Sequence, residues 1–200
     1  MDKLIVGYAP TILGEYDIVC PEMMFVQDMP VIMPGSDLRL PKNLSFIEPL
    51  FEKIQYSAKA DYVYVSCKSM FTTVQSRGRP GWHLDGFGTD DINYIWSDDF
   101  PTEFYNEIIE VTDDPIISRV DMLESVDERN ITTYPNKNLL VMDNKCIHRV
   151  SVDKREGFRT FIKITVSKNQ FRLKGNSHNY LFDYDWEMIP RTLDRNQPSK

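Results

Sequence analysis

Two of the three histidines in this chain lie in segments that could bind a metal ion. His83 and Asp85 are separated by one residue in the segment PGWHLDGFG. Side chains at positions i and i+2 of a strand point to the same face, so this imidazole and carboxylate can converge on one ion. Gly81, Gly86 and Gly88 should let the backbone bend around the pair.

A third ligand is available in the segment NLLVMDNKCIHRV, where an apolar run and a turn at Asp143 and Asn144 precede His148. We expect His148 to enter a short strand that lies beside His83. Two neutral imidazoles and one carboxylate on one side of a six-coordinate ion leave three positions free, as in non-haem iron oxygenases. A His-x-Asp pair alone is a weak signal, because a hydrogen-bonded surface pair has the same spacing.

Arg159 follows His148 by eleven positions, at the start of the apolar run FRTFIKITV. A strand at this place can direct the guanidinium inward, near the metal. The planar guanidinium binds a carboxylate through two hydrogen bonds, so Arg159 suits the far end of a dicarboxylic acid. The alternative is a surface arginine on an edge strand.

The combination of His83-Leu84-Asp85, His148 and Arg159 resembles the pattern of the 2-oxoglutarate and Fe(II)-dependent dioxygenases, over roughly residues 61 to 166. The resemblance implies a double-stranded β-helix, a jelly-roll barrel similar to the cupins, with iron at its open end. It also implies Fe(II) as cofactor, 2-oxoglutarate and O2 as co-substrates, and release of succinate and CO2 with hydroxylation of an organic substrate. Asp85 separates the chain from the halogenating branch, which lacks this carboxylate.

One departure from that pattern concerns the co-substrate. Many relatives place Ser or Thr two residues after the arginine, and here that position is Phe161. Tyr94, Tyr64 and Thr165 could supply the missing hydroxyl, since they lie in strands expected to line the same barrel. Ordinary packing is the alternative for each, because strand register cannot be read from the sequence.

Short runs rich in β-branched and aromatic residues predict the strands that must position these groups. They are 61–67, 92–96, 103–111, 138–142 and 159–166. Without an alternating helix pattern, they favour an antiparallel barrel or sandwich in a mainly β (α+β) fold with a few flanking helices. An amphipathic helix is expected at 45–57, and 118–130 is either a short helix or a charged loop.

The length of 200 residues suits a single domain. We expect residues 1–60 to give N-terminal strands and a helix that support the barrel, 61–166 to form its core, and 167–200 to be a C-terminal extension. Arg77 and Arg79 could form a basic lip before the first ligand, or be merely solvated. Trp82 and Trp96 are either core residues or substrate contacts.

The composition limits which kinds of partner and which cellular location we expect for this chain. A formal charge of -7 does not favour nucleic acid, although it does not exclude it. No apolar run is long enough to cross a bilayer and no secretory signal is visible, so a cytoplasmic protein is expected. Three cysteines are too few for a disulfide framework, and Cys146 is expected to pack rather than to bind metal.

Two other functions fit part of the pattern. A zinc hydrolase could use the same His83, Asp85 and His148, but Arg159 would then have no role. A β-barrel that only binds a ligand is the second alternative, since a fold does not guarantee activity. The substrate is expected to be a small molecule or a side chain, and its identity and the oligomeric state are left open.

Overall fold

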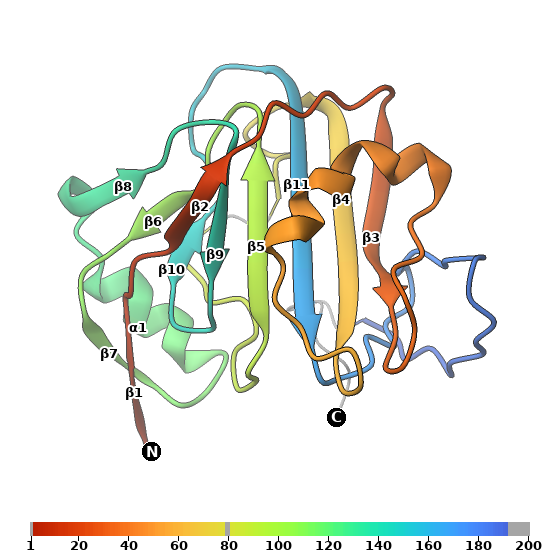
Figure 1. Cartoon of the computed structure of the whole chain (residues 1–200). Helices are drawn as coiled ribbons and strands as arrows, with labels where there is room; N and C mark the ends of the chain where they lie inside the picture. The colour runs from red at the N-terminus through yellow and green to blue at the C-terminus, as the bar shows by residue number, and fades with distance from the viewer. Residues whose placement is uncertain (1, 79–80, 192–200) are drawn as a thin grey trace.

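A six-stranded antiparallel sheet contains the longest strands of the protein (Figure 1). In the computed structural model, which describes residues 2–78 and 81–191, its strand order is β2-β9-β5-β11-β4-β3. The strands are β2 (Thr11–Glu15), β3 (Met24–Ile32), β4 (Tyr62–Thr72), β5 (Ile92–Ser97), β9 (Asn138–Met142) and β11 (Gly157–Ser167). The runs predicted as strands at 61–67, 92–96, 138–142 and 159–166 are thus confirmed, because β-branched and aromatic side chains pack well on a pleated surface.

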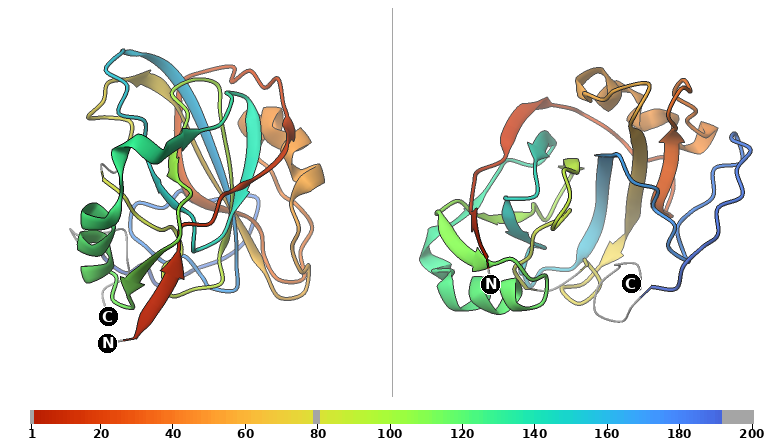
Figure 2. Two further views of the ribbon diagram at one scale, coloured as in Figure 1. Left: turned by 90° about the vertical axis from the view of Figure 1, so that its left-hand side faces the viewer. Right: turned by 90° about the horizontal axis from the view of Figure 1, so that it is seen from below.

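A smaller sheet has the order β10-β6-β8 and lies beside the large one (Figure 2). Its strands are β6 (Glu103–Tyr105), β8 (Ile131–Thr133) and β10 (Ile147–Arg149). The single strand predicted at 103–111 is wrong in extent, because the chain leaves the sheet after Tyr105. Residues 109–112 form a separate strand, β7 (Ile109–Thr112), which pairs with β1 (Lys3–Val6).

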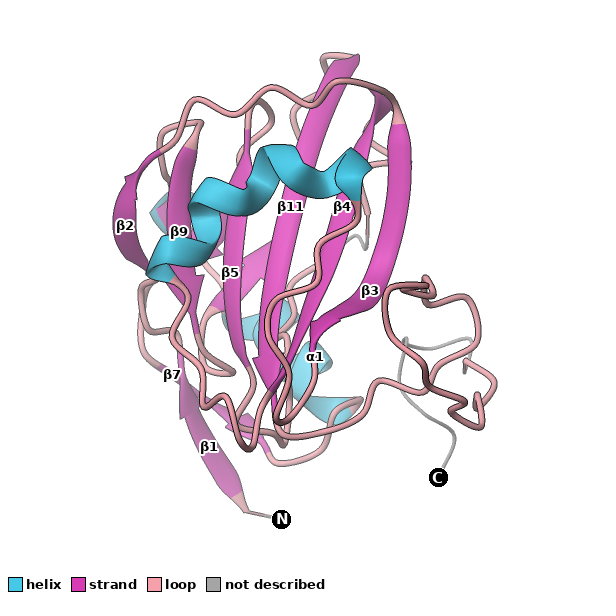
Figure 3. Ribbon diagram, turned by 45° about the vertical axis from the view of Figure 1, so that its right-hand side comes forward, coloured by secondary structure: helices cyan, strands magenta, loops and turns pink. Residues whose placement is uncertain are grey.

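The helix expected at 45–57 is a 3-10 helix, η1, that spans Lys42–Lys53. It crosses the face of the large sheet that is turned away from the small sheet (Figure 3). Leu44, Ile47 and Leu50 are its buried residues, and their spacing of three matches the three residues per turn of a 3-10 helix. The amphipathic pattern thus predicted the place of this helix but not its 3-10 form.

The segment 118–130 is helical rather than a loop. It contains α1 (Ile117–Ser125) and the short 3-10 helix η2 (Glu128–Asn130). Met122 of α1 packs in a cluster with Val6, Trp82 and Ile147, on the side of the small sheet turned away from the large one. None of the helices within the described ranges has both the length and the apolar character needed to cross a lipid bilayer.

Residues alternate between two environments along each strand of the large sheet. The outer face, as we call the side covered by η1, holds the largest apolar cluster, which includes Ile162 and Ile164 of β11. The inner face, which is turned toward the small sheet, has a smaller cluster with Ile95, Leu140 and, from the small sheet, Phe104. The inner face also carries the polar groups described next.

Candidate metal centre

His83 and His148 lie opposite each other as an isolated antiparallel bridge. The backbone N–H of His83 donates to the carbonyl of His148 at 3.0 Å, and that of His148 donates to the carbonyl of His83 at 3.1 Å. The two rings lie with their centroids 4.4 Å apart, and both residues are buried. The neighbouring position expected for the two histidines is therefore present, although on the His83 side it is a single bridge and not a regular strand.

Asp85 completes the cluster from a turn that follows this bridge. Its Oδ1 is 3.9 Å from Nε2 of His83, and its Oδ2 is 3.8 Å from Nε2 of His148. One ligand atom from each of the three residues lies within 4.8 Å of the others. The expected convergence occurs, but a tight turn produces it and not the alternation of a strand.

Glycine is needed in this turn. Gly86 has φ of +72°, and a Cβ there would lie 3.0 Å from Cβ of Asp91 and 3.0 Å from Oγ1 of Thr89. Gly81 and Gly88 also have positive φ, at +82° and +74°. The bending predicted for these glycines is confirmed.

Both imidazoles are oriented by main-chain carbonyls. Nδ1 of His83 is 2.9 Å from the carbonyl oxygen of Gly81, and Nδ1 of His148 is 2.9 Å from that of Cys146. A proton on Nδ1 satisfies these carbonyls and leaves the Nε2 lone pairs directed toward Asp85, which is how metal-binding histidines are commonly held. The donor set of two imidazoles and one carboxylate therefore fits a divalent first-row metal ion.

Lys163 brings a positive charge from the large sheet to this cluster. Its Nζ donates to Oδ2 of Asp85 at 3.2 Å, and both side chains are about one-fifth exposed. Lys163 lies on the inner face of β11, paired with Ser66 of β4 and Ile95 of β5. The candidate site thus lies between the two sheets.

Arg159 lies on the same inner face of β11 and is only 4% exposed. Its Nε donates to the carbonyl of Asp99 at 3.1 Å, and its guanidinium lies 4.7 Å from the centroid of the Phe161 ring. Among the residues that the structure describes, none offers an acceptor to Nη2 of Arg159. Burial, with a contribution from Arg77, lowers the pKa of Arg159 to about 10, so the group is still cationic at neutral pH.

The three candidates for the missing hydroxyl lie in different surroundings. Thr165 is on the inner face and donates to Oδ1 of Asn93 at 2.7 Å. Tyr64 pairs with Thr165, but its hydroxyl donates to the carbonyl of Asn169 at 2.9 Å. Tyr94 belongs to the apolar cluster of the outer face, and its hydroxyl accepts from the N–H of Gln55, so we do not include it in the site.

Arg77 is buried rather than solvated, which corrects the expectation of a basic lip. It is 4% exposed, and its guanidinium donates to the carbonyls of Asp153 and Arg155. Arg77 therefore supports the loop between β10 and β11, and its ring contact is with Phe100 at 3.7 Å. Arg79 lies outside the described residues.

Two inner-face residues were missed by the sequence reasoning. They are Lys163 and Asn93. Nδ2 of Asn93 is buried and has no acceptor among the residues described. The signal for Lys163 was available, because it is four positions after Arg159 and so must share its face in an unbroken strand. Asn93 had no such signal, since its face depends on which residue of β11 it pairs with.

The remaining candidates for chemistry are structural. Trp82 and Trp96 are buried in apolar clusters. Burial raises the pKa of the Cys146 thiol to about 12, so this residue packs as a neutral side chain.

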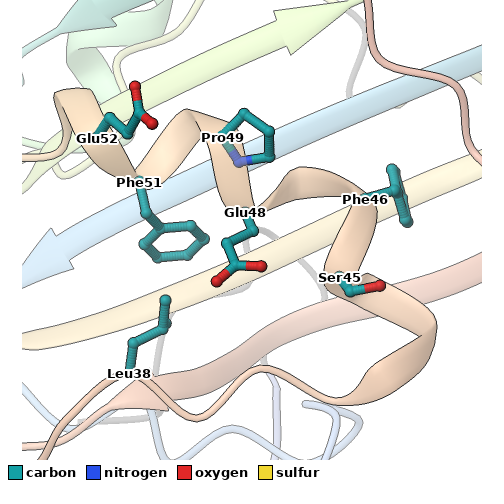
Figure 4. A pocket seen from close by; sticks show the side chains of 7 residues that line it. All are labelled: Leu38, Ser45, Phe46, Glu48, Pro49, Phe51 and Glu52. Atoms are coloured by element: carbon teal, nitrogen blue, oxygen red, sulfur yellow. The ribbon is translucent and has the colours of Figure 1, made fainter.

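A surface groove of about 570 Å³ lies beside η1, lined by Leu38, Ser45, Phe46, Glu48, Pro49, Phe51 and Glu52 (Figure 4). It is on the outer side of the large sheet, away from the histidines.

Comparison of the chain with protein-family models, curated protein sequences and solved structures gives no significant match. The chemistry of the site is therefore inferred from its own geometry.

Proposed function

We propose that the protein is an Fe(II)- and 2-oxoglutarate-dependent dioxygenase that hydroxylates an organic substrate. His83, Asp85 and His148 would bind the iron, and Arg159 would bind the far carboxylate of 2-oxoglutarate. The observation that carries the proposal is a pair of complementary features, one between the two sheets and one on the inner face of β11. A three-ligand cluster is present, and so is a buried cation whose Nη2 has no acceptor among the described residues.

Nη2 of Arg159, which has no acceptor among the described residues, is the feature that points to the co-substrate. A buried donor without an acceptor costs about 1–3 kcal/mol, so such groups are rare unless a ligand or water satisfies them. A carboxylate is the group that a guanidinium binds best, through two parallel hydrogen bonds. A metal centre between the sheets, with such a cation on the inner face of β11, suits a chelating dicarboxylic acid.

The course of the chain supports a double-stranded β-helix. From β4 to β6 and again from β8 to β11 the chain alternates between the large sheet and the side of the small sheet, with β7 in a separate pair between the two runs, and the second half of the chain pairs back on the first. The pairs are β6 with β8, β5 with β9, His83 with His148 of β10, and β4 with β11. A long ribbon of paired strands that coils through two sheets is what a jelly-roll barrel requires.

The residues of the proposed site would divide metal binding and orientation of the co-substrate between them. Bound iron would supply the reaction with O2 in which 2-oxoglutarate, O2 and R–H give succinate, CO2 and R–OH. The two histidines present Nε2, because main-chain carbonyls hold their Nδ1 protons. Arg159 fixes the orientation of the acid, and Phe161, beside it, keeps water from that end of the wall.

The two alternatives make different use of the same residues. A zinc hydrolase needs the three ligands and a water, but it gives Nη2 of Arg159 no task. A barrel that only binds a ligand needs neither the main-chain orientation of the imidazoles nor a buried arginine. Both are outcomes of the experiment that follows.

The test is anaerobic addition of Fe(II) and 2-oxoglutarate to the purified protein, followed by visible absorption. We expect the weak charge-transfer band of an iron-bound 2-oxo acid, and its loss in the variant His148→Ala. His178→Ala is the matched control, because His178 is exposed and lies in the C-terminal extension. A folded protein that binds Zn(II) but gives no band with Fe(II) and 2-oxoglutarate would contradict the proposal.

A further inference from the structure

The inner face of β4 and β11 carries three cations, although the chain as a whole has a formal charge of -7. They are Lys68, Arg159 and Lys163, and the acids that act on them are Asp28, Asp85, Asp91, Asp98 and Asp99. Lys68 pairs with Phe161, so it lies between Arg159 and Lys163 along this face. A divalent metal ion bound at the cluster would add positive charge beside Lys163.

Lys163 is the cation in direct contact with the proposed metal ligands. Its ammonium is 3.2 Å from Oδ2 of Asp85, and the same oxygen is 3.8 Å from Nε2 of His148. A metal ion bound by these residues would therefore lie close to Lys163, and two positive charges at such a distance repel each other strongly inside a protein. An anion next to the metal removes this repulsion.

Asn93 supplies a second donor at the same level of the wall. It pairs with Thr165 across β5 and β11, so it is the diagonal neighbour of Lys163, which pairs with Ile95. The hydroxyl of Thr165 donates to Oδ1 of Asn93 at 2.7 Å and so directs the amide. Nδ2 of Asn93 is left without an acceptor within the described part of the chain, although the residue is only 1% exposed.

Lys163 and Arg159 are four residues apart on the same face, which separates their Cα atoms by about 13 Å in a strand. Both side chains are long, so their cationic ends can approach the two ends of one short diacid. On the basis of the proposed function, we propose that Lys163 and Asn93 bind the carboxylate of the 2-oxo acid that lies next to the metal. Arg159 then binds the carboxylate at the other end of the acid. Lys163 and Asn93 are thus co-substrate-binding residues.

The experiment compares two acids in the anaerobic Fe(II) protein. 2-Oxoglutarate has both carboxylates, and 2-oxobutyrate lacks the far one. We expect Lys163→Met to weaken binding of both acids by a similar factor, roughly 10- to 100-fold, as for the loss of a charged hydrogen bond. Lys163→Arg should retain most of the affinity, and Asn93→Asp should weaken both acids as well.

Lys68→Met is the matched control, because Lys68 is a cation of the same face that lies over the Phe25 ring at 5.2 Å and has no described contact with Asp85. We expect it to change neither affinity by more than about 3-fold, which is within the effect of a distant charge. A second readout is Fe(II) affinity without any acid. It should rise in Lys163→Met, since a neighbouring positive charge is removed.

Three results would overturn the inference while leaving the proposed function intact. They are unchanged affinity for both acids in Lys163→Met, weaker binding of 2-oxoglutarate alone, and a fall in Fe(II) affinity, which would mean that Lys163 only orients Asp85. If the wild-type protein gave no band with either acid, the proposed function would fail together with this inference. Circular dichroism and a melting curve establish that each variant is folded.

Discussion

The outer and inner faces of β11 differ in nearly every property, although they alternate along the same eleven residues. On the outer face, Ile162, Ile164 and Val166 are buried in the main apolar cluster under η1. On the inner face, Arg159 and Lys163 are charged, and Lys163 contacts Asp85 of the candidate site. One strand thus supports the core with one set of side chains and the proposed chemistry with the other.

The difference shows which observations carry functional information. Buried apolar residues such as Ile164 need no explanation beyond the hydrophobic effect. The buried Arg159 needs a further explanation, because its Nη2 has no acceptor within residues 2–78 and 81–191, and a buried donor without an acceptor destabilises the folded state. The outer face should therefore determine stability, and the inner face should determine binding.

The largest expected effect is on the outer face. Ile164→Ala removes a side chain that is 0% exposed, and we expect it to lower the free energy of unfolding by about 2–5 kcal/mol because a cavity remains. Urea unfolding measures this change. Fe(II) and 2-oxoglutarate affinities of the folded fraction should stay as in the wild type, and a loss of either would show that the two faces are not independent.

Arg159→Met should instead weaken ligand binding and leave the stability of the fold intact. We expect 2-oxoglutarate affinity to fall by about 1.5–3 kcal/mol, as for a charged hydrogen bond, while Fe(II) still binds. Without co-substrate, the melting temperature should hold or rise, because the change removes a buried donor that finds no acceptor in the described part of the chain. Arg159→Lys is the control, since it keeps the charge but not the two-pronged geometry. Unchanged 2-oxoglutarate binding in titration would refute the assigned role.

The smallest expected effects compare two hydroxyls that the sequence could not distinguish. Thr165→Val leaves Oδ1 of Asn93 without its donor, so we expect a loss of about 1–2 kcal/mol in stability and weaker 2-oxoglutarate binding. Tyr94→Phe removes a contact with the N–H of Gln55 on the outer side, so 2-oxoglutarate affinity should not change. Equal effects of the two variants on that affinity would contradict the assignment of faces.

The sequence predicted the strands well where local composition decides the structure. β4, β5 and β11 follow runs rich in β-branched and aromatic residues, and β9 follows an apolar run of leucine and valine, all of which pack well on a pleated, half-buried surface. The residues of the candidate metal centre, His83, Asp85 and His148, could also be named from short segments of sequence. These features depend on a few adjacent residues.

Features that depend on distant pairing could not be predicted. Tyr94 faces away from the site because its partner in β11 is Ile164 and not a residue of the inner face. Arg77 is buried because the loop around Asp153 and Arg155 turns its carbonyls toward it. The 3-10 form of η1 goes with burial of every third side chain, which depends on how the helix packs within the fold and cannot be read from its sequence alone.

The bridge between residues 83 and 148 has a consequence for the versatility of the site. Its two hydrogen bonds join main-chain atoms, so the segments are held together whatever side chains occupy these positions. In the proposed metal centre, replacing an imidazole by a thiol or a carboxylate should therefore change which metal ion is preferred without separating the segments. On such a scaffold a single substitution would be enough to change the metal and its reactivity.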